Sequence, residues 1–456
     1  MKNKYLKWLL IGMFWIMIWQ GLAMVVSSTL LLPTPIETLQ ALIRLLSDST
    51  FYLDAGMTIL RCMVAIVLAL LFGLMLSILA YKNRLIRDVL ALPVAFFKAV
   101  PIMAVAIYLI LLLTAGSVPI FVCFVMCFPI VYTNLLTGLD NMDKNLLEMA
   151  QIYNIKGMKL IRFIYLPSLY PYYKSAMSIV AGMSWKAIVT AEVLSIPKLS
   201  LGYQLMNSKY YLNTDSLFAY VLVIIAISVA FEKLIKGDGG KRAKIVYKNG
   251  TKKTGVNVPN LNNRSDIAVK LDSIYKSFDD KEVLKNFSME LIHGSKTACM
   301  GASGSGKTTL IRIIAGLEKP DSGKVTVNAN RIAVIFQEDR LLPWLNVYDN
   351  LAIVNNDKSR IVELLRAVGL EEDADKLPSE LSGGMKFRLS MARAFIYDAD
   401  LLLADEPFQG LDADTRKFVI ENLWKTGVIG KTVLLITHSE DEMSLVDKTF
   451  KIPANN

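Results

Sequence analysis

The sequence predicts two regions of different fold class: an all-α transmembrane region of about six helices, followed by an α/β domain with a phosphate-binding loop. Three observations predict this division. Long apolar runs without charge are confined to residues 1–236, a basic stretch follows at 237–265, and a glycine loop lies between a strand-like and a helix-like run in residues 266–456. With 54% hydrophobic residues and a mean hydropathy of +0.42, the 456-residue chain is unusually apolar for a soluble protein.

The apolar runs set the number of expected membrane spans. The run from Ala99 to Leu139 has 41 residues without a charge. As a helix it would be about 61 Å long, about twice the ~30 Å core of a bilayer, so it has to fold back. We expect the turn at Ala115-Gly116-Ser117 and count this run as two spans. The other four are expected within 8–36 and 62–81, and near 170–194 and 216–235.

Basic residues between the spans predict the orientation of this region. If the N-terminus is cytoplasmic, most of the flanking basic residues are cytoplasmic too: Lys2, Lys4, Lys7, Lys82, Arg84, Arg87, Lys144, Lys156, Lys159, Arg162, Lys233 and Lys236. Only Arg44, Lys198 and Lys209 then lie outside. The pattern predicts a multi-pass membrane protein in contact with lipid, with an even number of spans and with both ends in the cytoplasm, the C-terminal domain included. A cleaved signal peptide is the alternative for the N-terminus, but the apolar run is longer than such peptides use.

Charged residues inside or beside the expected spans include Arg61, Lys98, Lys186 and Glu192. Because intramembrane charges usually face the protein interior or a wet path, Lys98 and Lys186 are candidates for contact with an anion in transit. The alternative, which we favour, places Lys98 and Glu192 near span ends, where their side chains reach the interface. The four cysteines and two histidines show no metal-ligand spacing.

The stretch 237–265 has seven basic residues and one acidic residue. Nucleic acid is one conceivable partner for such a stretch. We favour a solvated linker near the anionic inner leaflet, and no nucleic-acid partner.

After the linker, the sequence reads as strand, glycine loop and helix. Gly301, Gly304, Gly306, Lys307 and Thr308 match G-x-x-x-x-G-K-[ST], in which backbone N–H groups cradle phosphates. Lys307 can reach the β- and γ-phosphates, and the Thr308 hydroxyl can bind Mg²⁺. The motif predicts an ATP site that comprises Gly301, Ala302, Ser303, Gly304, Ser305, Gly306, Lys307, Thr308 and Thr309. A P-loop GTPase is disfavoured because the guanine motif N-K-x-D is absent from the sequence.

Two further apolar runs end in residues suited to phosphate chemistry. Asp405 follows "LLLA" at the strand edge where ligands bind, so we expect it to face Mg²⁺. Glu406 is then placed to polarise a water for attack on the γ-phosphate. His438 follows the strand-like run "TVLLIT" and is expected at the same edge.

A second anion site is predicted at Ser382-Gly383-Gly384, where glycines open a helix and leave N–H groups free. The phosphate loop already surrounds the phosphates of its own chain. We therefore expect two such domains to face each other head to tail, each supplying this turn to the γ-phosphate bound by the other.

Residues 266–456 resemble the nucleotide-binding domain of ABC transporters. The resemblance rests on the motifs above, on "LSGGMKFRLSMARA" and on "IFQEDRLLPWLNVYDN". It implies that Phe278 stacks on adenine, that Gln337 contacts Mg²⁺ and the membrane domain, and that Glu406 and His438 are catalytic. It also implies that Asp412 belongs with the signature residues facing the partner's ATP. Met385 replaces the usual glutamine of the signature, from which we expect an altered rate rather than inactivity.

Residues 148–171 resemble the EAA loop of importer permeases, whose short helices dock on the ATPase. Glu148, Ala150 and Pro167 fit that loop, and Asn154 stands where glycine is usual; asparagine can also adopt the left-handed turn. Nearly the whole chain outside the linker is similar to subunits of the nitrate, taurine and aliphatic-sulfonate importer group. The resemblance implies a permease at 1–236 fused through the linker 237–265 to an ATPase at 266–456.

These expectations combine into an ATP- and Mg²⁺-dependent importer that acts as a homodimer. Its substrate would be a small anion such as a sulfonate, taurine or nitrate, delivered by a separate extracytoplasmic binding protein. The alternatives are import of a thiamine-precursor pyrimidine or similar heterocycle, an exporter, and an ATP-gated signalling complex. The sequence does not identify the solute.

Overall fold

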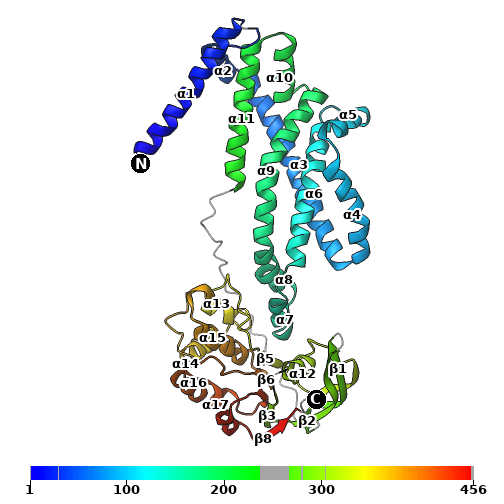
Figure 1. Ribbon diagram of the computed structural model, residues 1–456, viewed down its shortest axis with the longest axis vertical. Helices are drawn as coiled ribbons and strands as arrows, with labels where there is room; N and C mark the ends of the chain where they lie inside the picture. Colours follow the sequence, from blue (N-terminus) through cyan, green and yellow to red (C-terminus); the bar gives the residue numbers. More distant parts are fainter. Residues whose placement is uncertain (1, 29, 237–265, 279–280, 303, 453–456) are drawn as a thin grey trace. The chain divides into compact units, whose positions relative to one another are not determined.

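The computed structural model describes residues 2–28, 30–236, 266–278, 281–302 and 304–452 (Figure 1). The predicted linker 237–265 and Ser303 of the predicted ATP site lie outside the described residues. The chain divides into two compact units. The first comprises Met1–Met142 and Ser168–Arg242, and the second comprises Asp143–Pro167 and Ala243–Asn456.

The first unit is helical throughout its described residues. Its elements are α1 (Lys2–Val26), α2 (Pro35–Ser47), α3 (Ser49–Lys82), α4 (Arg84–Ala99), α5 (Ile102–Leu112), α6 (Val118–Asp140), α9 (Leu166–Ser195), α10 (Leu201–Tyr210) and α11 (Thr214–Lys236). Short polar side chains set helix starts: Thr34 and Glu37 form a capping box at α2, and Asn83 caps α4.

The core of this unit lies between α3, α6, α9 and α11. Small residues on α3 let α6 approach closely, and a Cβ on Gly73 would lie 2.6 Å from Cγ1 of Val131. Trp185 of α9 is buried and donates from Nε1 to the carbonyl of Ile224 in α11. The bundle is thus held by small-residue packing and by a few polar contacts, as expected where lipid surrounds it.

In the described residues, four helical segments are long and apolar enough to cross a membrane: 49–82, 118–140, 157–195 and 214–234. The pair α4 and α5, bent by 104°, would make a fifth. The apolar part of α1, Leu10–Val26, is shorter than these. The expected six spans are therefore reduced by this measure to four, or up to five.

The long apolar run does fold back where predicted, because residues 115–117 form a turn between α5 and α6. Its first half was wrongly expected to be a span of its own. Pro101 is the N-cap of α5, which has only 11 residues, and the residue before a proline is pushed out of the helical region. The expected loop at 82–87 is also absent, since only Asn83 separates α3 from α4.

The expectation that the Glu192 side chain reaches the membrane interface at a span end is wrong. Its side chain is fully buried and pairs with Arg61 at 2.8 Å. Oε2 of Glu192 also accepts hydrogen bonds from the Thr58 hydroxyl and the Gly202 backbone. Arg61 donates a second bond to the carbonyl of Leu199. The charges face the interior and tie the 199–202 segment to α3 and α9. Lys98 and Lys186 are exposed.

The second unit contains two sheets. An antiparallel sheet has the order β2-β1-β4, and a parallel sheet has the order β5-β6-β7-β3-β8. The strands are β1 (Ile267–Phe278), β2 (Lys281–Ile292), β3 (Lys296–Met300), β4 (Ser322–Val327), β5 (Ile332–Ile335), β6 (Leu401–Asp405), β7 (Thr432–Ile436) and β8 (Lys448–Lys451). The strands β6 and β7 are buried along their whole length, as expected for a parallel sheet covered by helices.

Helices of the second unit surround the parallel sheet: α12 (Lys307–Ile314), α13 (Val347–Ala352), α14 (Lys358–Ala367), α15 (Gly383–Ile396), α16 (Ala413–Val419) and α17 (Lys425–Gly427). The same unit has the 3₁₀-helices η3 (Pro378–Glu380) and η5 (Glu440–Leu445) and the π-helix η4 (Ile420–Trp424). The segment from the middle of the chain adds α7 (Lys144–Ile152), α8 (Gly157–Leu160) and η1 (Ile161–Tyr165). Side chains of this segment belong to the same hydrophobic core as the sheets.

Candidate ATP site and coupling segment

The phosphate loop joins β3 to α12, as predicted. Gly306 has a φ of 93°, and a Cβ there would lie 2.9 Å from Cγ1 of Val283, so the loop requires glycine at this position. The ammonium of Lys307 donates to the carbonyls of Gly301 and Ala302 at 2.9 and 2.8 Å. The other described members of the predicted site are in the same loop and helix start: Gly304, Ser305, Thr308 and Thr309.

Asp405 ends β6 beside this loop. Its carboxylate Oδ2 accepts a 2.7 Å hydrogen bond from the Thr308 hydroxyl. Burial raises the pKa of Asp405, and the Thr308 hydrogen bond and the Lys307 charge oppose that rise. Two oxygen ligands are thus adjacent at the phosphate loop. This fits Mg²⁺, which typically uses one or two protein oxygens together with phosphate and water.

Glu406 and His438 come together at the same sheet edge. Nε2 of His438 lies 3.1 Å from Oε1 of Glu406. Glu406 has a left-handed backbone with φ of 50°, and its N–H donates to the carbonyl of Ile436 at the end of β7. Such a conformation costs energy for a residue with a side chain, and the contact to β7 holds it in place.

Gln337 follows β5 at the neighbouring strand end. Its amide Nε2 donates to Oε1 of Gln409 at 3.2 Å. Gln409 belongs to the loop after Glu406, to whose carbonyl its N–H donates. Gln337 is thus joined to the segment that carries Asp405 and Glu406.

The Ser382-Gly383-Gly384 turn opens α15, as the sequence predicted. The Ser382 hydroxyl caps the helix by accepting from the N–H of Met385 at 3.3 Å. Asp412 caps α16 in the same way, by accepting from the N–H of Thr415 at 2.9 Å. A Cβ on Gly384 would reach Cδ2 of Leu411 at 3.6 Å, so the two caps belong to neighbouring parts of one surface.

Phe278 ends β1, and its side chain is 43% exposed. The ammonium of Lys276 lies 5.0 Å from the centre of its ring. Phe278 is thus an exposed aromatic residue with a cation beside its ring at the end of this strand.

The middle segment of the chain is fixed to the ATPase by Glu148 of α7. Its carboxylate pairs with Arg312 of α12 at 2.6 Å and with Arg340 at 2.7 Å. Burial alone would raise the pKa of Glu148, but the hydrogen bonds and charges of the two arginines outweigh burial and lower it. The carboxylate is therefore charged and bridges the phosphate-loop helix and the segment after Gln337.

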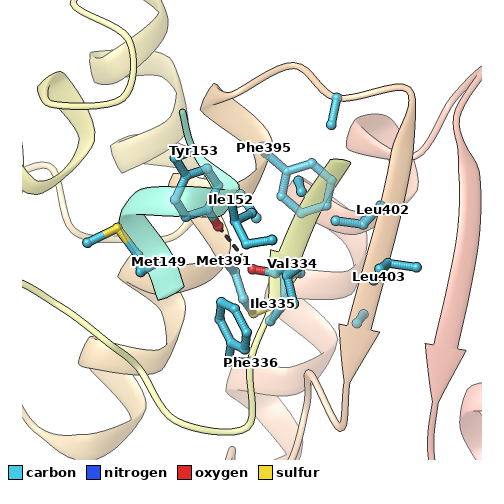
Figure 2. Close-up of a cluster of buried hydrophobic side chains, with 14 of the residues drawn as sticks. Met149, Ile152, Tyr153, Val334, Ile335, Phe336, Met391, Phe395, Leu402 and Leu403 are labelled. Carbon is cyan, nitrogen blue, oxygen red and sulfur yellow. Dashed lines mark hydrogen bonds between the residues drawn. The ribbon is translucent and has the colours of Figure 1, made fainter. Parts of the chain in front are cut away.

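Apolar packing surrounds this ion pair. Figure 2 shows Tyr153, directly after α7, against Val334, Ile335 and Phe336, with Met391 and Phe395 of α15 nearby. The Tyr153 hydroxyl donates to the carbonyl of Val334 at 3.0 Å. We call residues 143–167 the coupling segment, since their contacts join them to the ATPase.

The other predicted coupling residues occupy defined positions. Asn154 has a φ of 52°, so the left-handed turn expected of it is present. Ala150 is buried in the contact with the ATPase, and its carbonyl accepts from the N–H of Ile155. Pro167 lies directly after the π-helical turn η1, within the continuous helical segment 157–195.

Sequence reasoning missed the ATPase residues that receive this segment. Arg312 and Arg340 pair with Glu148, and the indole of Trp344 donates to the carbonyl of Phe163 at 2.8 Å. The guanidinium of Arg393, from α15, donates to the carbonyls of Asp339 and Arg340. Arg340 and Trp344 lie in the quoted stretch "FQEDRLLPW", which was the available signal.

Comparisons with known proteins agree with this geometry. Residues 284–409 match the family model described as "ABC transporter", and residues 65–236 match "Binding-protein-dependent transport system inner membrane component". The "Aliphatic sulfonates import ATP-binding protein SsuB 3" of Pseudomonas syringae pv. tomato is 41% identical over 199 residues, 41% of this chain and 73% of that protein. The chain belongs to the ABC transporter family.

Two more known proteins are similar to part of the chain. SsuB of Granulibacter bethesdensis is 42% identical over 184 residues, 39% of this chain and 76% of that protein. A solved structure, the post-hydrolysis dimer of the ATP-binding cassette MJ0796 bound to ADP and Pi, has a TM-score of 0.38 and 28% identity, and covers 40% of this chain and 94% of that chain. The SsuB matches cover the ATPase part only. This ABC chain thus fuses the permease and the ATPase of an importer, and it couples ATP hydrolysis to transport.

Proposed function

We propose that this ABC chain acts as a homodimer that imports a small anion of the sulfonate class, with taurine and nitrate as further candidates. The SsuB relatives import aliphatic sulfonates according to their names, which supports the choice of substrate. A separate extracytoplasmic binding protein would deliver the solute, in keeping with the family description of the permease part.

Each ATP would be bound by residues of both chains. The loop 301–309 and Phe278 hold the nucleotide, and Thr308, Asp405 and Gln337 are the residues that would hold Mg²⁺, which supplies charge neutralisation at the phosphates. Ser382, Gly383, Gly384 and Asp412 of the other chain face the γ-phosphate. The start of α15 supports this role, because glycines occupy its first two positions after Ser382 and the first backbone N–H groups of a helix favour an anion.

Glu406 would accept a proton from water as the water oxygen attacks the γ-phosphorus and the bond to ADP breaks. His438, 3.1 Å from Glu406, orients that carboxylate and contacts the γ-phosphate. The left-handed backbone at Glu406 supports this assignment, since strain of this kind concentrates at functional sites.

The bridge at Glu148 carries the proposal that nucleotide binding drives transport. One carboxylate contacts Arg312, in the helix that starts at the phosphate loop, and Arg340, three residues after Gln337. Arg393 fixes the backbone of Asp339 and Arg340 from the helix that starts at Ser382. The helix α12 and the segment after Gln337 therefore contact α7 directly, and α15 contacts it through the backbone held by Arg393. A movement of α7 would be passed to the permease helices that flank the coupling segment in the sequence.

Contact between the coupling segment and the ATPase requires both to lie on the same side of the membrane. The ATPase and both ends of the permease region would lie in the cytoplasm of a bacterial-type plasma membrane. ATP closure then opens the permease outward, and hydrolysis returns it to the inward-facing state.

Uptake into proteoliposomes tests the proposed function. The full chain is reconstituted with ATP enclosed and binding protein outside, and uptake of ethanesulfonate, taurine, nitrate and a thiamine-precursor pyrimidine is compared. We expect ATP-dependent uptake of ethanesulfonate or taurine only with the binding protein. Uptake of the pyrimidine alone would reject the anion, and solute efflux without a binding protein would reject import.

A further inference from the structure

Lys186 is a cation on a face of α9 that other described residues leave open. Its neighbours Trp185, Ala187 and Ile188 are buried in the bundle, whereas Lys186 is exposed. In the described residues, no hydrogen bond or ion pair is found for its ammonium. An exposed charge on an otherwise apolar helix has to be matched by water, by lipid head groups or by a ligand.

The depth of Lys186 argues against lipid head groups. Tyr170, Tyr173 and Lys174 mark one membrane interface on α9, because aromatic and basic residues gather there. Lys186 lies about 18 Å further along the helix and about 13 Å before its end at Ser195. Helical side chains tilt toward the N-terminus, so the ammonium points away from the nearer end.

The other two intramembrane cations either have a protein partner or lie at a helix end. Arg61 is buried and pairs with Glu192, and it also donates to the carbonyl of Leu199. Lys98 is in the last turn of α4, directly before the break between α4 and α5. Lys186 is thus the described cation best placed to meet an anion within the membrane.

The open face continues from Lys186 toward the N-terminal end of α9. Ser175, Ile179 and Gly182 lie on the same helix face as Lys186 by their spacing. Space is available there, because a Cβ on Gly182 would meet no atom within 4 Å.

Ser175 also lines a hollow of about 420 Å³ between α6 and α9. Its other lining residues are Thr133, Asn134, Thr137, Pro171 and Tyr172. The hydroxyls of Thr133 and Thr137 donate to carbonyls of their own helix, which leaves their oxygens able to accept from water. A polar hollow therefore follows the lysine along one helix face.

We propose that Lys186 binds the anionic head group of the solute midway through the permease, and that the polar hollow beside Ser175 receives the solute next. This inference rests on the proposed function, in that it requires an anionic solute. A cation on an uncovered apolar face would select anions over neutral heterocycles, because only an anion offsets the unpaired charge.

The test compares Lys186→Gln, Lys186→Arg and the matched control Lys174→Gln on the same helix. Each full-length variant is reconstituted with the binding protein, and ethanesulfonate uptake and ATP hydrolysis are measured together. We expect Lys186→Gln to lower the maximal uptake rate at least tenfold, with the KM for the liganded binding protein unchanged, and to raise the ATP hydrolysed per solute imported by a similar factor. Lys186→Arg retains uptake, and Lys174→Gln matches the wild type.

Three results would overturn the assignment. Wild-type uptake by Lys186→Gln would show that the charge is unnecessary. A proportional loss of uptake and hydrolysis, or loss of the dimer on crosslinking, would show a structural role or a pair between two copies. If the unaltered protein takes up the pyrimidine and no anion, both the proposed substrate and the role of Lys186 are rejected. If the wild type takes up ethanesulfonate and Lys186→Gln does so equally well, the role of Lys186 is rejected and the proposed substrate stands.

Discussion

At the scale of single residues, the site depends on carboxylates whose environments differ. Asp405 is buried against Thr308, whereas Glu406 is partly accessible and is 3.1 Å from His438. The first is suited to a metal ion and the second to a water molecule. Adjacent carboxylates in one strand end can thus serve two different purposes.

Replacing Glu406 by glutamine separates binding from chemistry. The amide keeps the size of the side chain but cannot accept the proton of water, so we expect hydrolysis to fall by about 10²–10⁴. Nucleotide binding should persist and the closed dimer should accumulate. Phosphate release and crosslinking of the two ATPase domains measure these effects, and unchanged turnover would remove Glu406 from its assigned role.

Asn154 offers a backbone test at one residue. Its φ of 52° suits glycine and asparagine, whereas a β-branched side chain there costs about 1–2 kcal/mol. We expect Asn154→Gly to keep full uptake and Asn154→Val to lower it roughly tenfold, at equal expression. Equal uptake by both variants would show that this turn does not matter for coupling.

At the scale of elements, the coupling segment is the part that the sequence described least completely. The resemblance placed Glu148 and Asn154 in a docking loop, but Arg312 and Arg340 are 164 and 192 residues away from Glu148 along the chain. Pairing at such separation depends on the fold of the sheets and is not readable from local patterns. Glu192 was misjudged for the same reason, because its partner Arg61 lies on another helix.

Local signals predicted other elements well. The turn at 115–117, the helix start at Ser382-Gly383-Gly384 and the glycine loop all depend on residues next to each other in the sequence. The predicted count of six spans differs from the four, or up to five, that length and composition give, because α5 has only 11 residues and bends against α4 and because the apolar part of α1 is short.

Removing the charge of Glu148 tests the docking of α7. Glu148→Gln removes the carboxylate that Arg312 and Arg340 share and leaves Arg340 with the longer 3.7 Å contact to Glu338, and hydrogen bonds to charged groups are worth about 1.5–3 kcal/mol. We therefore expect uptake per ATP hydrolysed to fall by about tenfold or more. Glu371→Gln is the control, since its pair with Arg366 is exposed and contributes little. Equal uptake by both variants would contradict the bridge.

The same ion pairs set an acid limit for docking. The pKa of Glu148 is lowered from its ordinary 4.5 when α7 is docked. The contribution of the pairs is therefore complete above about pH 4.5 and is lost as the pH falls through the lowered pKa. The hydrogen-exchange protection factors of residues 144–152, in which the intrinsic pH dependence of exchange is divided out, should be constant at neutral pH and should fall only in that acidic range; a fall near pH 6–7 would point to another group.

At the scale of the whole molecule, the proposed function requires each ATP to be bound by residues of two chains. The structure of one chain supplies a phosphate loop and a capped glycine turn. If the phosphate loop and the glycine turn of one chain contact the same nucleotide, one chain makes a complete site. If they contact two different nucleotides, a complete site needs two chains.

Mixed dimers can distinguish these arrangements. If Lys307→Ala is in one chain and Ser382→Arg in the other, shared sites leave one site intact, and we expect up to half of the wild-type hydrolysis. If both changes are in one chain and the partner is unaltered, shared sites leave none intact, and hydrolysis should be near zero. Sites confined to one chain predict the reverse order of activities. Ser382→Ala, which removes the helix cap without adding bulk, controls for the local cost of about 1 kcal/mol.

The contacts of the coupling segment also indicate what the fusion of permease and ATPase in one chain adds. Its grip on the ATPase comes from Glu148, Tyr153 and the Trp344 indole, and none of these contacts needs a peptide connection between residues 236 and 266. Separately encoded halves of the same sequence would keep the means to recognise each other. Joining them in one polypeptide thus fixes their one-to-one stoichiometry during synthesis, while recognition itself remains a property of the interface.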